Sequence, residues 1–175
     1  MREGLAATAI AAGLLLAGCS SGATPPTQPE LPQRAAPQKS LTASDPCTLL
    51  TADQLKALAL EQEPKQVDQD GYKGCEFGSG TPDGPGWTAF AAADENRTFQ
   101  QFAEQHKGAQ QLDVAFYPTA KVNDEKGCTL ALDVSDTGTL LVRALVRPGA
   151  PIEVGGGCEA AIRVAEEIIQ TLPDA

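Results

Sequence analysis

Hydrophobic residues recur with two different periods between residues 45 and 173. In CEAAIRVAEEIIQTL (158–172) apolar residues return every three to four positions, which predicts an amphipathic helix ending before Pro173. CTLALDV (128–134) and TLLVRALV (139–146) instead alternate, and they flank Ser-Asp-Thr-Gly, which indicates a β-hairpin. Helical and strand patterns within one stretch of chain predict an α+β domain.

Shorter elements of both kinds precede this hairpin. Thr51 to Gln54 form a capping-box pattern, which predicts a helix that ends before Pro64. Asp94 or Asn96 is expected to cap a second helix that continues to about Lys107. Further strands are expected at 72–79, 87–93 and 112–117. The order predicts a single antiparallel sheet of about five strands, flanked by N-terminal, middle and C-terminal helices.

The chain begins with a short apolar run behind a positive charge. Arg2 precedes about 13 apolar or small residues, too few for a membrane-spanning helix but typical of a secretory signal. The run ends in Leu16-Ala17-Gly18-Cys19, which resembles the bacterial lipobox. That resemblance implies cleavage before Cys19, a diacylglycerol thioether on its sulfur, and often an N-acyl chain such as palmitate. Two or more acyl chains anchor a protein stably to a membrane.

A Pro-rich segment follows this motif. Residues 20–44 contain five prolines and few large apolar side chains, which is typical of a linker. We therefore expect a signal peptide over 1–18, a lipidated tether over 19–44 and an α+β domain over 45–175. The expected location is extracytoplasmic, on the outer face of the cell membrane.

The charge of the chain limits its partners. The net charge is −10, and Lys and Arg residues are scattered along the sequence. Nucleic-acid binding needs a basic patch that neutralises phosphates, so we expect no nucleic-acid partner. The expected partners are the membrane, through the lipid on Cys19, and an unknown envelope protein or small ligand.

Four cysteines remain once Cys19 is set aside: Cys47, Cys75, Cys128 and Cys158. An exported domain with an even number of cysteines is expected to form disulfides, and four cysteines allow three pairings. Loop entropy gives about 3.6 kcal/mol for a loop of about 30 residues and about 4.5 kcal/mol for about 80, so stability does not favour sequential pairing. Closeness along the chain favours it weakly, and we expect 47–75 and 128–158. The spacing fits neither a zinc site nor a CxxC redox site, so no metal or cofactor is expected.

No catalytic set is apparent, and we expect the protein not to be an enzyme. His106 is the only histidine, and its spacing after Phe99 and Phe102 places it on a helix. No GxSxG nucleophile motif is present. DQDG (68–71) lacks the spacing of a calcium loop and is interpreted as a turn, as is DEK (124–126).

Trp87 is the one candidate for a binding surface. It follows a Pro/Gly-rich loop at the edge of an expected strand, where an aromatic side chain can line a ligand site. Packing in the core is the favoured alternative for this residue.

Several of these motifs resemble one known family. DPCTLLTADQLKAL, GCEF, GCTLALDV and a final cysteine-led helix that ends in LP, all behind a lipobox, are similar to an actinobacterial lipoprotein family of unknown function, DUF3558. The resemblance covers about Asp45 to Pro173. It implies a location in the cell envelope and paired disulfides, and it implies no reaction.

The sequence therefore predicts a membrane-anchored lipoprotein with a non-enzymatic binding or interaction domain. One alternative is an accessory subunit of a cell-envelope secretion or transport complex. A less favoured alternative is an envelope hydrolase that uses His106.

Overall fold

The computed structural model describes residues 32–42, 45–81 and 84–175. Leu16, Ala17 and Gly18, the expected signal-cleavage residues, and Cys19, the expected lipid-attachment residue, lie outside this part of the chain.

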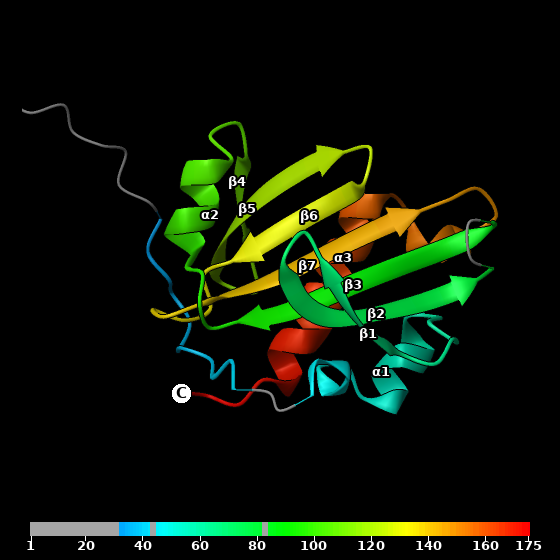
Figure 1. Ribbon diagram of the computed structural model, residues 1–175, viewed down its shortest axis with the longest axis horizontal. Coiled ribbons are helices and arrows are strands. Elements are labelled where there is room, and N and C mark those ends of the chain that lie inside the picture. The colour runs from blue at the N-terminus through cyan, green and yellow to red at the C-terminus, as the bar shows by residue number, and fades with distance from the viewer. Residues whose placement is uncertain (1–31, 43–44, 82–83) are drawn as a thin grey trace, which may run out of the picture. The chain divides into compact units, whose positions relative to one another are not determined.

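Within the described residues, seven antiparallel strands form one sheet, in the order β1-β2-β3-β7-β6-β5-β4 (Figure 1). The strands are β1 (Lys65–Gln69), β2 (Tyr72–Gly80), β3 (Gly86–Asp94), β4 (Gln110–Val114), β5 (Tyr117–Asp124), β6 (Gly127–Leu132) and β7 (Thr139–Val146). The single antiparallel sheet is confirmed, and the expectation of about five strands is corrected to seven.

The two additional strands lacked the sequence signals on which the expectation relied. β1 is a polar edge strand without a buried side chain, so it shows no apolar alternation. The expected strand over 112–117 divides into the end of β4 and the start of β5, joined by a hairpin turn at Ala115 and Phe116. Both turn residues have positive φ angles, 49° and 68°. Such turns favour Asn and Gly, and neither residue is present here.

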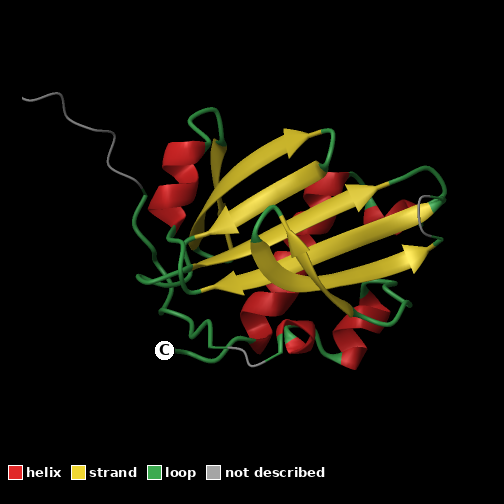
Figure 2. Cartoon of the chain, in the orientation of Figure 1, coloured by secondary structure: helices red, strands yellow, loops and turns green. Residues whose placement is uncertain are grey.

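In the part of the chain that the structure describes, three α-helices and two short 3₁₀ helices accompany the sheet (Figure 2). They are η1 (Pro46–Thr48), α1 (Ala52–Ala57), α2 (Phe99–Gln105), η2 (Ile152–Val154) and α3 (Gly157–Thr171). Thr51 forms the expected capping box with Gln54. Thr98, not Asp94 or Asn96, caps α2, because its hydroxyl accepts a hydrogen bond from the Gln101 amide. None of the helices in the described residues is long and apolar enough to cross a membrane.

The strand alternation divides the buried residues between the two faces of the sheet. On β6, Leu130 and Leu132 belong to the main core, whereas Ala131 between them belongs to a smaller cluster on the opposite face. α3 packs against β6 and β7 on the main-core side. α2 packs against β5 and β6 and buries Phe99 and Phe102 in the smaller cluster. The same face also carries charged and polar side chains, among them Glu76, Thr88 and Arg143.

Residues 32–42, which we call the N-terminal strap, pack against the domain. The Ser40 amide donates a hydrogen bond of 2.9 Å to the Pro173 carbonyl, and the Tyr117 hydroxyl donates one of 2.7 Å to the Pro37 carbonyl. Leu41 is 4% exposed and joins the main core. The expected boundary near residue 45 therefore moves upstream. The strap is held by backbone hydrogen bonds and by scattered side-chain contacts, such as those of Arg34 and Gln38 with Asp136. Contacts of this kind leave no periodic pattern in the sequence.

Candidate ligand-binding groove

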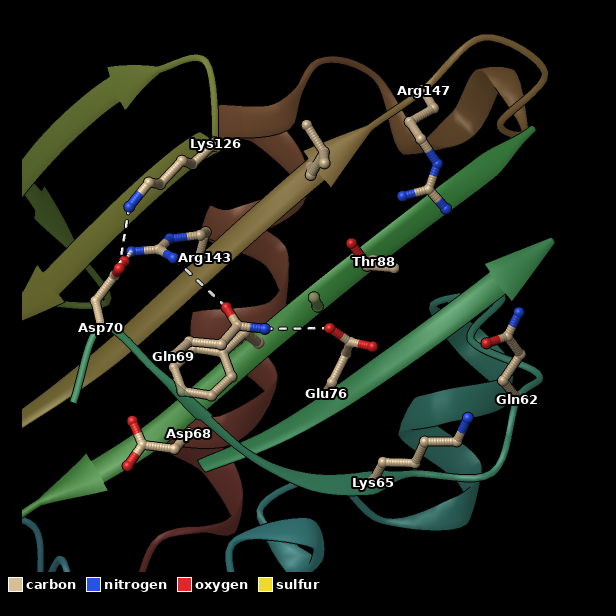
Figure 3. A pocket seen from close by; sticks show the side chains of 13 residues that line it. Gln62, Lys65, Asp68, Gln69, Asp70, Glu76, Thr88, Lys126, Arg143 and Arg147 are labelled. Atoms are coloured by element: carbon tan, nitrogen blue, oxygen red, sulfur yellow. Dashed lines mark hydrogen bonds and ion pairs between the residues drawn. The ribbon is translucent and has the colours of Figure 1, made fainter. Parts of the chain in front are cut away.

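A groove of about 650 Å³ lies on the second face of the sheet, between the β1–β2 hairpin and the strands β3 and β7 (Figure 3). Seven charged side chains line it: Lys65, Asp68, Asp70, Glu76, Lys126, Arg143 and Arg147. Four of these are cations and three are anions, whereas the whole chain has a net charge of −10. The groove is therefore far less acidic than the protein as a whole.

Strand alternation produces the floor of the groove. On β7, Arg143 lies between the fully buried Val142 and Ala144, so its side chain emerges on the opposite face. The register pairs Phe90 of β3 with Arg143 on one side and with Glu76 of β2 on the other. Glu76, Phe90 and Arg143 thus form one row across three adjacent strands.

The β1–β2 hairpin forms one wall of the groove. Its turn is Asp70-Gly71, and both residues have positive φ angles, 54° and 77°. Asp followed by Gly is a preferred pair for this type of tight turn. Arg97 supports the hairpin, because its guanidinium lies 3.3 Å from the centre of the Tyr72 ring and donates a hydrogen bond to the Gly71 carbonyl.

Three residues that meet at the tip of the β1–β2 hairpin form what we call the clasp: Asp70 of the hairpin turn, Lys126 of the β5–β6 turn and Arg143 of β7. Lys126 Nζ donates a hydrogen bond of 3.0 Å to one oxygen of Asp70, and Arg143 Nη2 donates one of 2.9 Å to the other (Figure 3). These two cations hold the pKa of Asp70 below its ordinary value of 3.8. Asp70 is therefore a carboxylate at neutral pH.

Gln69 connects the clasp to the floor of the groove. Its Nε2 donates a hydrogen bond of 3.1 Å to Glu76, while its Oε1 accepts one of 3.5 Å from Arg143 Nη1. Arg143 also donates through Nε to Thr129 Oγ1 at 2.9 Å. Several partners besides Asp70 thus orient the guanidinium of Arg143.

The other end of the groove offers polar groups that carry few contacts. Arg147 lies at the far end from Asp70 and donates to the backbone carbonyls of Gly84 and Thr81 at 2.7 and 3.4 Å (Figure 3). Within the described residues, the side chains of Lys65 and Thr88 make no hydrogen bond or ion pair. These donors are available to a molecule in the groove.

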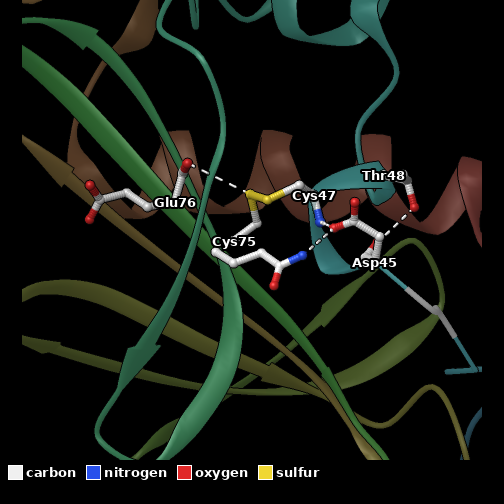
Figure 4. Close-up of a disulfide and its surroundings, with 6 residues drawn as sticks. Asp45, Cys47, Thr48, Cys75 and Glu76 are labelled. Atoms are coloured by element: carbon white, nitrogen blue, oxygen red, sulfur yellow. Dashed lines mark hydrogen bonds between the residues drawn. A yellow bond between two sulfur atoms is a disulfide. The ribbon is translucent and has the colours of Figure 1, made fainter.

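The four cysteines form two disulfides in the sequential arrangement. Cys47 of η1 bonds to Cys75 of β2, with Cα atoms 5.0 Å apart (Figure 4). Cys128 of β6 bonds to Cys158 at the start of α3, with Cα atoms 4.9 Å apart. The first bridge ties β2 to η1 immediately beside Glu76, so it also fixes the strand that forms part of the groove floor.

Trp87 does not line a surface. Its side chain is 1% exposed and belongs to the main core on the α3 side of the sheet. The suggestion of a binding surface at this residue is therefore corrected in favour of core packing. The next residue, Thr88, points to the opposite face and lines the groove.

His106 lies outside the groove, at the C-terminal end of α2. Its ring stacks on Phe102 with centroids 4.1 Å apart, and its Nδ1 lies 3.0 Å from the Phe102 carbonyl. The residues that share its shallow surface depression, 108–110 and 121–123, include no Ser, Thr or Cys. Among the described residues there is no group of three or more His, Cys, Asp or Glu side chains placed to hold a metal ion.

Sequence reasoning missed the groove because its parts looked like ordinary turns. Asp70 lies in DQDG (68–71) and Lys126 in DEK (124–126), and the fold brings these two turns together. One available signal was Arg143 within an otherwise apolar strand, followed at even spacing by Arg147 immediately after its end. Two cations on the same face of a strand indicate a polar surface rather than a second core.

The comparisons with known proteins give a family and no activity. Residues 14–171 match the model of the family described as "Protein of unknown function (DUF3558)". No curated protein and no solved structure matches the chain.

Proposed function

The chain belongs to the DUF3558 family, and we propose that it is an extracytoplasmic lipoprotein that binds a small ligand in the groove without transforming it. The lipobox-like Leu16 to Cys19 supports the anchor. The groove supports the binding role.

The observation that carries this proposal is a half-open groove whose polar groups are only partly used. Its volume of about 650 Å³ lies within the range of about 300–1,000 Å³ that is usual for small-molecule sites. Lys65 and Thr88 supply free hydrogen-bonding groups, while Phe90 and Leu145 supply apolar contact. A mixture of apolar surface and a few polar groups is typical of such sites.

The arrangement of the groove favours binding over catalysis. Its acids are Asp68, Asp70 and Glu76, and Asp70 is held as a carboxylate by two cations. An acid or base in catalysis instead works best with a pKa near the working pH. We therefore assign the groove to recognition and assign no reaction to it.

The strap limits how far the domain can lie from the membrane. If Cys19 carries the lipid, the chain from Cys19 to Pro32 spans at most about 45 Å, because an extended residue adds roughly 3.5 Å. A tether reaching to residue 44 would extend nearly twice as far. The ligand would thus be captured close to the membrane surface.

The test is recovery of the intact lipoprotein from membranes in a non-ionic detergent, followed by mass spectrometry of the small molecules that accompany it. We expect one compound at near-equal molar amount with the wild-type protein and with Lys56→Gln, a charge-matched control on α1. Arg143→Gln should lose it. A stoichiometric protein partner without any small molecule would favour the accessory-subunit alternative and contradict the proposal.

A further inference from the structure

We infer that the ligand of the groove is a small solute with an anionic group, a carboxylate or a phosphate, and that Asp70 occupies the position of this group in the unliganded protein. The inference rests on the proposed function, because it names the ligand class of the same groove. It goes further because it identifies the Asp70 side chain as a competitor of the ligand.

The clasp already binds an anion. The carboxylate of Asp70 lies between Lys126 and Arg143, which are 56 and 73 residues away in the sequence and belong to different elements. A guanidinium and an ammonium directed at one point form a geometry that suits a carboxylate or a phosphate equally well. The cations therefore form an anion site whose present occupant is a side chain of the same protein.

The Asp70 side chain is held less firmly than Arg143, which forms part of the site. The Asp70 side chain is 45% exposed, whereas that of Arg143 is 16% exposed. The hydrogen bonds of Arg143 to Thr129 and Gln69 do not involve Asp70 and can hold the guanidinium without it. Arg97 holds the hairpin by the Gly71 carbonyl, which leaves the Asp70 side chain free to rotate away. An incoming anion could thus replace Asp70 without unfolding the hairpin.

The remaining charges favour an anion at this position. Once Asp70 leaves, the groove retains four cations, Lys65, Lys126, Arg143 and Arg147, against the two anions Asp68 and Glu76. Charges in a concave site add to a local field that attracts ions of the opposite sign.

Glu76 limits how much negative charge the ligand carries. It lies on the floor beside Thr88, and its only side-chain partner among the described residues is Gln69. A second anionic group at this point would meet a carboxylate. The solute therefore carries its anionic group at the clasp and hydrogen-bond donors toward Glu76.

The experiment is a titration of the full-length protein in a non-ionic detergent, followed by amide chemical shifts. The probes are inorganic phosphate and acetate, added at constant ionic strength against sodium chloride. We expect saturable shifts at Asp70, Lys126 and Arg143. Arg143→Gln should weaken binding by about tenfold, because it removes a charge-assisted hydrogen bond.

The direction in which Asp70→Asn changes the affinity for phosphate distinguishes the inference from its alternatives. Asn tolerates the left-handed conformation of the turn, so the hairpin is retained while the competing charge is removed. We expect phosphate to bind several-fold more tightly to this variant than to the wild type, because phosphate no longer competes with an internal carboxylate for the two cations. Lys56→Gln, outside the groove, should bind phosphate as the wild type does.

Three results would overturn the inference. They are no saturable shift with either probe, an Asp70→Asn variant that binds no more tightly than the wild type, and shifts that appear only with phosphatidylglycerol vesicles and not with the free ions. The last result would assign the anion to a lipid headgroup. If an uncharged or cationic compound accompanies the purified lipoprotein and Arg143→Gln loses it, the proposed function stands and the anionic ligand class is wrong.

Discussion

Arg143 Nη2 donates a hydrogen bond of 2.9 Å to the carboxylate of Asp70, a residue 73 positions earlier in the chain. This contact joins the tip of the β1–β2 hairpin to β7 across the open face of the sheet. It converts a flat polar surface into a groove with a wall. The same contact fills the position where we expect the anionic group of a ligand to bind.

The clasp predicts a defined response to acid. Because the pKa of Asp70 in the folded protein lies below its ordinary value of 3.8, the carboxylate stabilises the fold above that pH. This contribution is lost as the pH falls through the folded-state pKa. The free energies of unfolding of the wild type and Asp70→Asn, measured in urea, should therefore differ at pH 7 and converge as the pH falls well below 3.8. If the difference in free energy of unfolding between the two proteins is unchanged in acid, the ionised clasp does not contribute to stability.

Arg34 of the strap forms ion pairs with Asp133 and Asp136, and this group predicts opposite pKa shifts for the two acids. Burial raises the pKa of Asp133, against an opposing effect of Arg34, whereas hydrogen bonds from Arg34 and Gln38 lower the pKa of Asp136. In a carboxyl-carbon titration by NMR, Asp133 should titrate above 3.8 and Asp136 below it. Arg34→Gln should raise both pKa values. If neither value changes in the variant, Arg34 and the strap do not contact these acids in solution.

The strap should contribute to stability. Leu41 is 4% exposed in the main core, and truncating a buried leucine to alanine removes about 2–5 kcal/mol. We expect Leu41→Ala to lose about 2 kcal/mol, at the low end of that range, because the strap can shift to relieve the cavity. The measurement is urea unfolding, with the exposed Thr42→Ala as the control. If the two variants are equally stable, the strap does not stabilise the domain and belongs to the tether instead.

Substitutions in the β4–β5 turn should stabilise the protein. Ala115 and Phe116 adopt φ angles of 49° and 68°, and the Phe116 side chain is 75% exposed. Replacing the pair by Asn-Gly relieves the strain of two non-glycine residues in this conformation, which is worth about 1–2 kcal/mol. Thermal unfolding of the double variant should shift upward by several degrees. A downward shift would mean that the Phe116 side chain makes a stabilising contact.

The disulfide pairing is open to a direct chemical test. Non-reducing peptide mapping should yield only the pairs 47–75 and 128–158. Replacing Cys128 and Cys158 together by serine should remove about 3.6 kcal/mol, the loop-entropy value for a closed loop of about 30 residues. Any other pair in the map would contradict the arrangement of η1 and α3 on the sheet.

The parts of the fold that the sequence predicted are those with regular burial. The 128–146 hairpin and the C-terminal helix each bury a continuous apolar face, so their patterns are strong. β1 buries no side chain, and the β4–β5 turn uses Ala and Phe where Asn or Gly is usual. Both therefore escaped prediction, since neither shows the local signal on which such predictions depend.

The groove was harder to predict, because it depends on contacts between distant residues. Asp70 and Lys126 each lie in a segment that is reasonably interpreted as a solvated turn. Only the curl of the hairpin over β7 brings them within 3.0 Å. Trp87 was easier, because its position after a Pro/Gly-rich loop allowed a surface role but core packing was the favoured alternative, and the residue is buried in the core.

The most direct test of the account is an experimental structure of the lipoprotein purified from its own membranes. We predict non-protein density in the groove, within hydrogen-bonding distance of Arg143 and Lys126, with the Asp70 side chain turned away from both. A groove without density, and with the clasp formed as described here, would contradict the account.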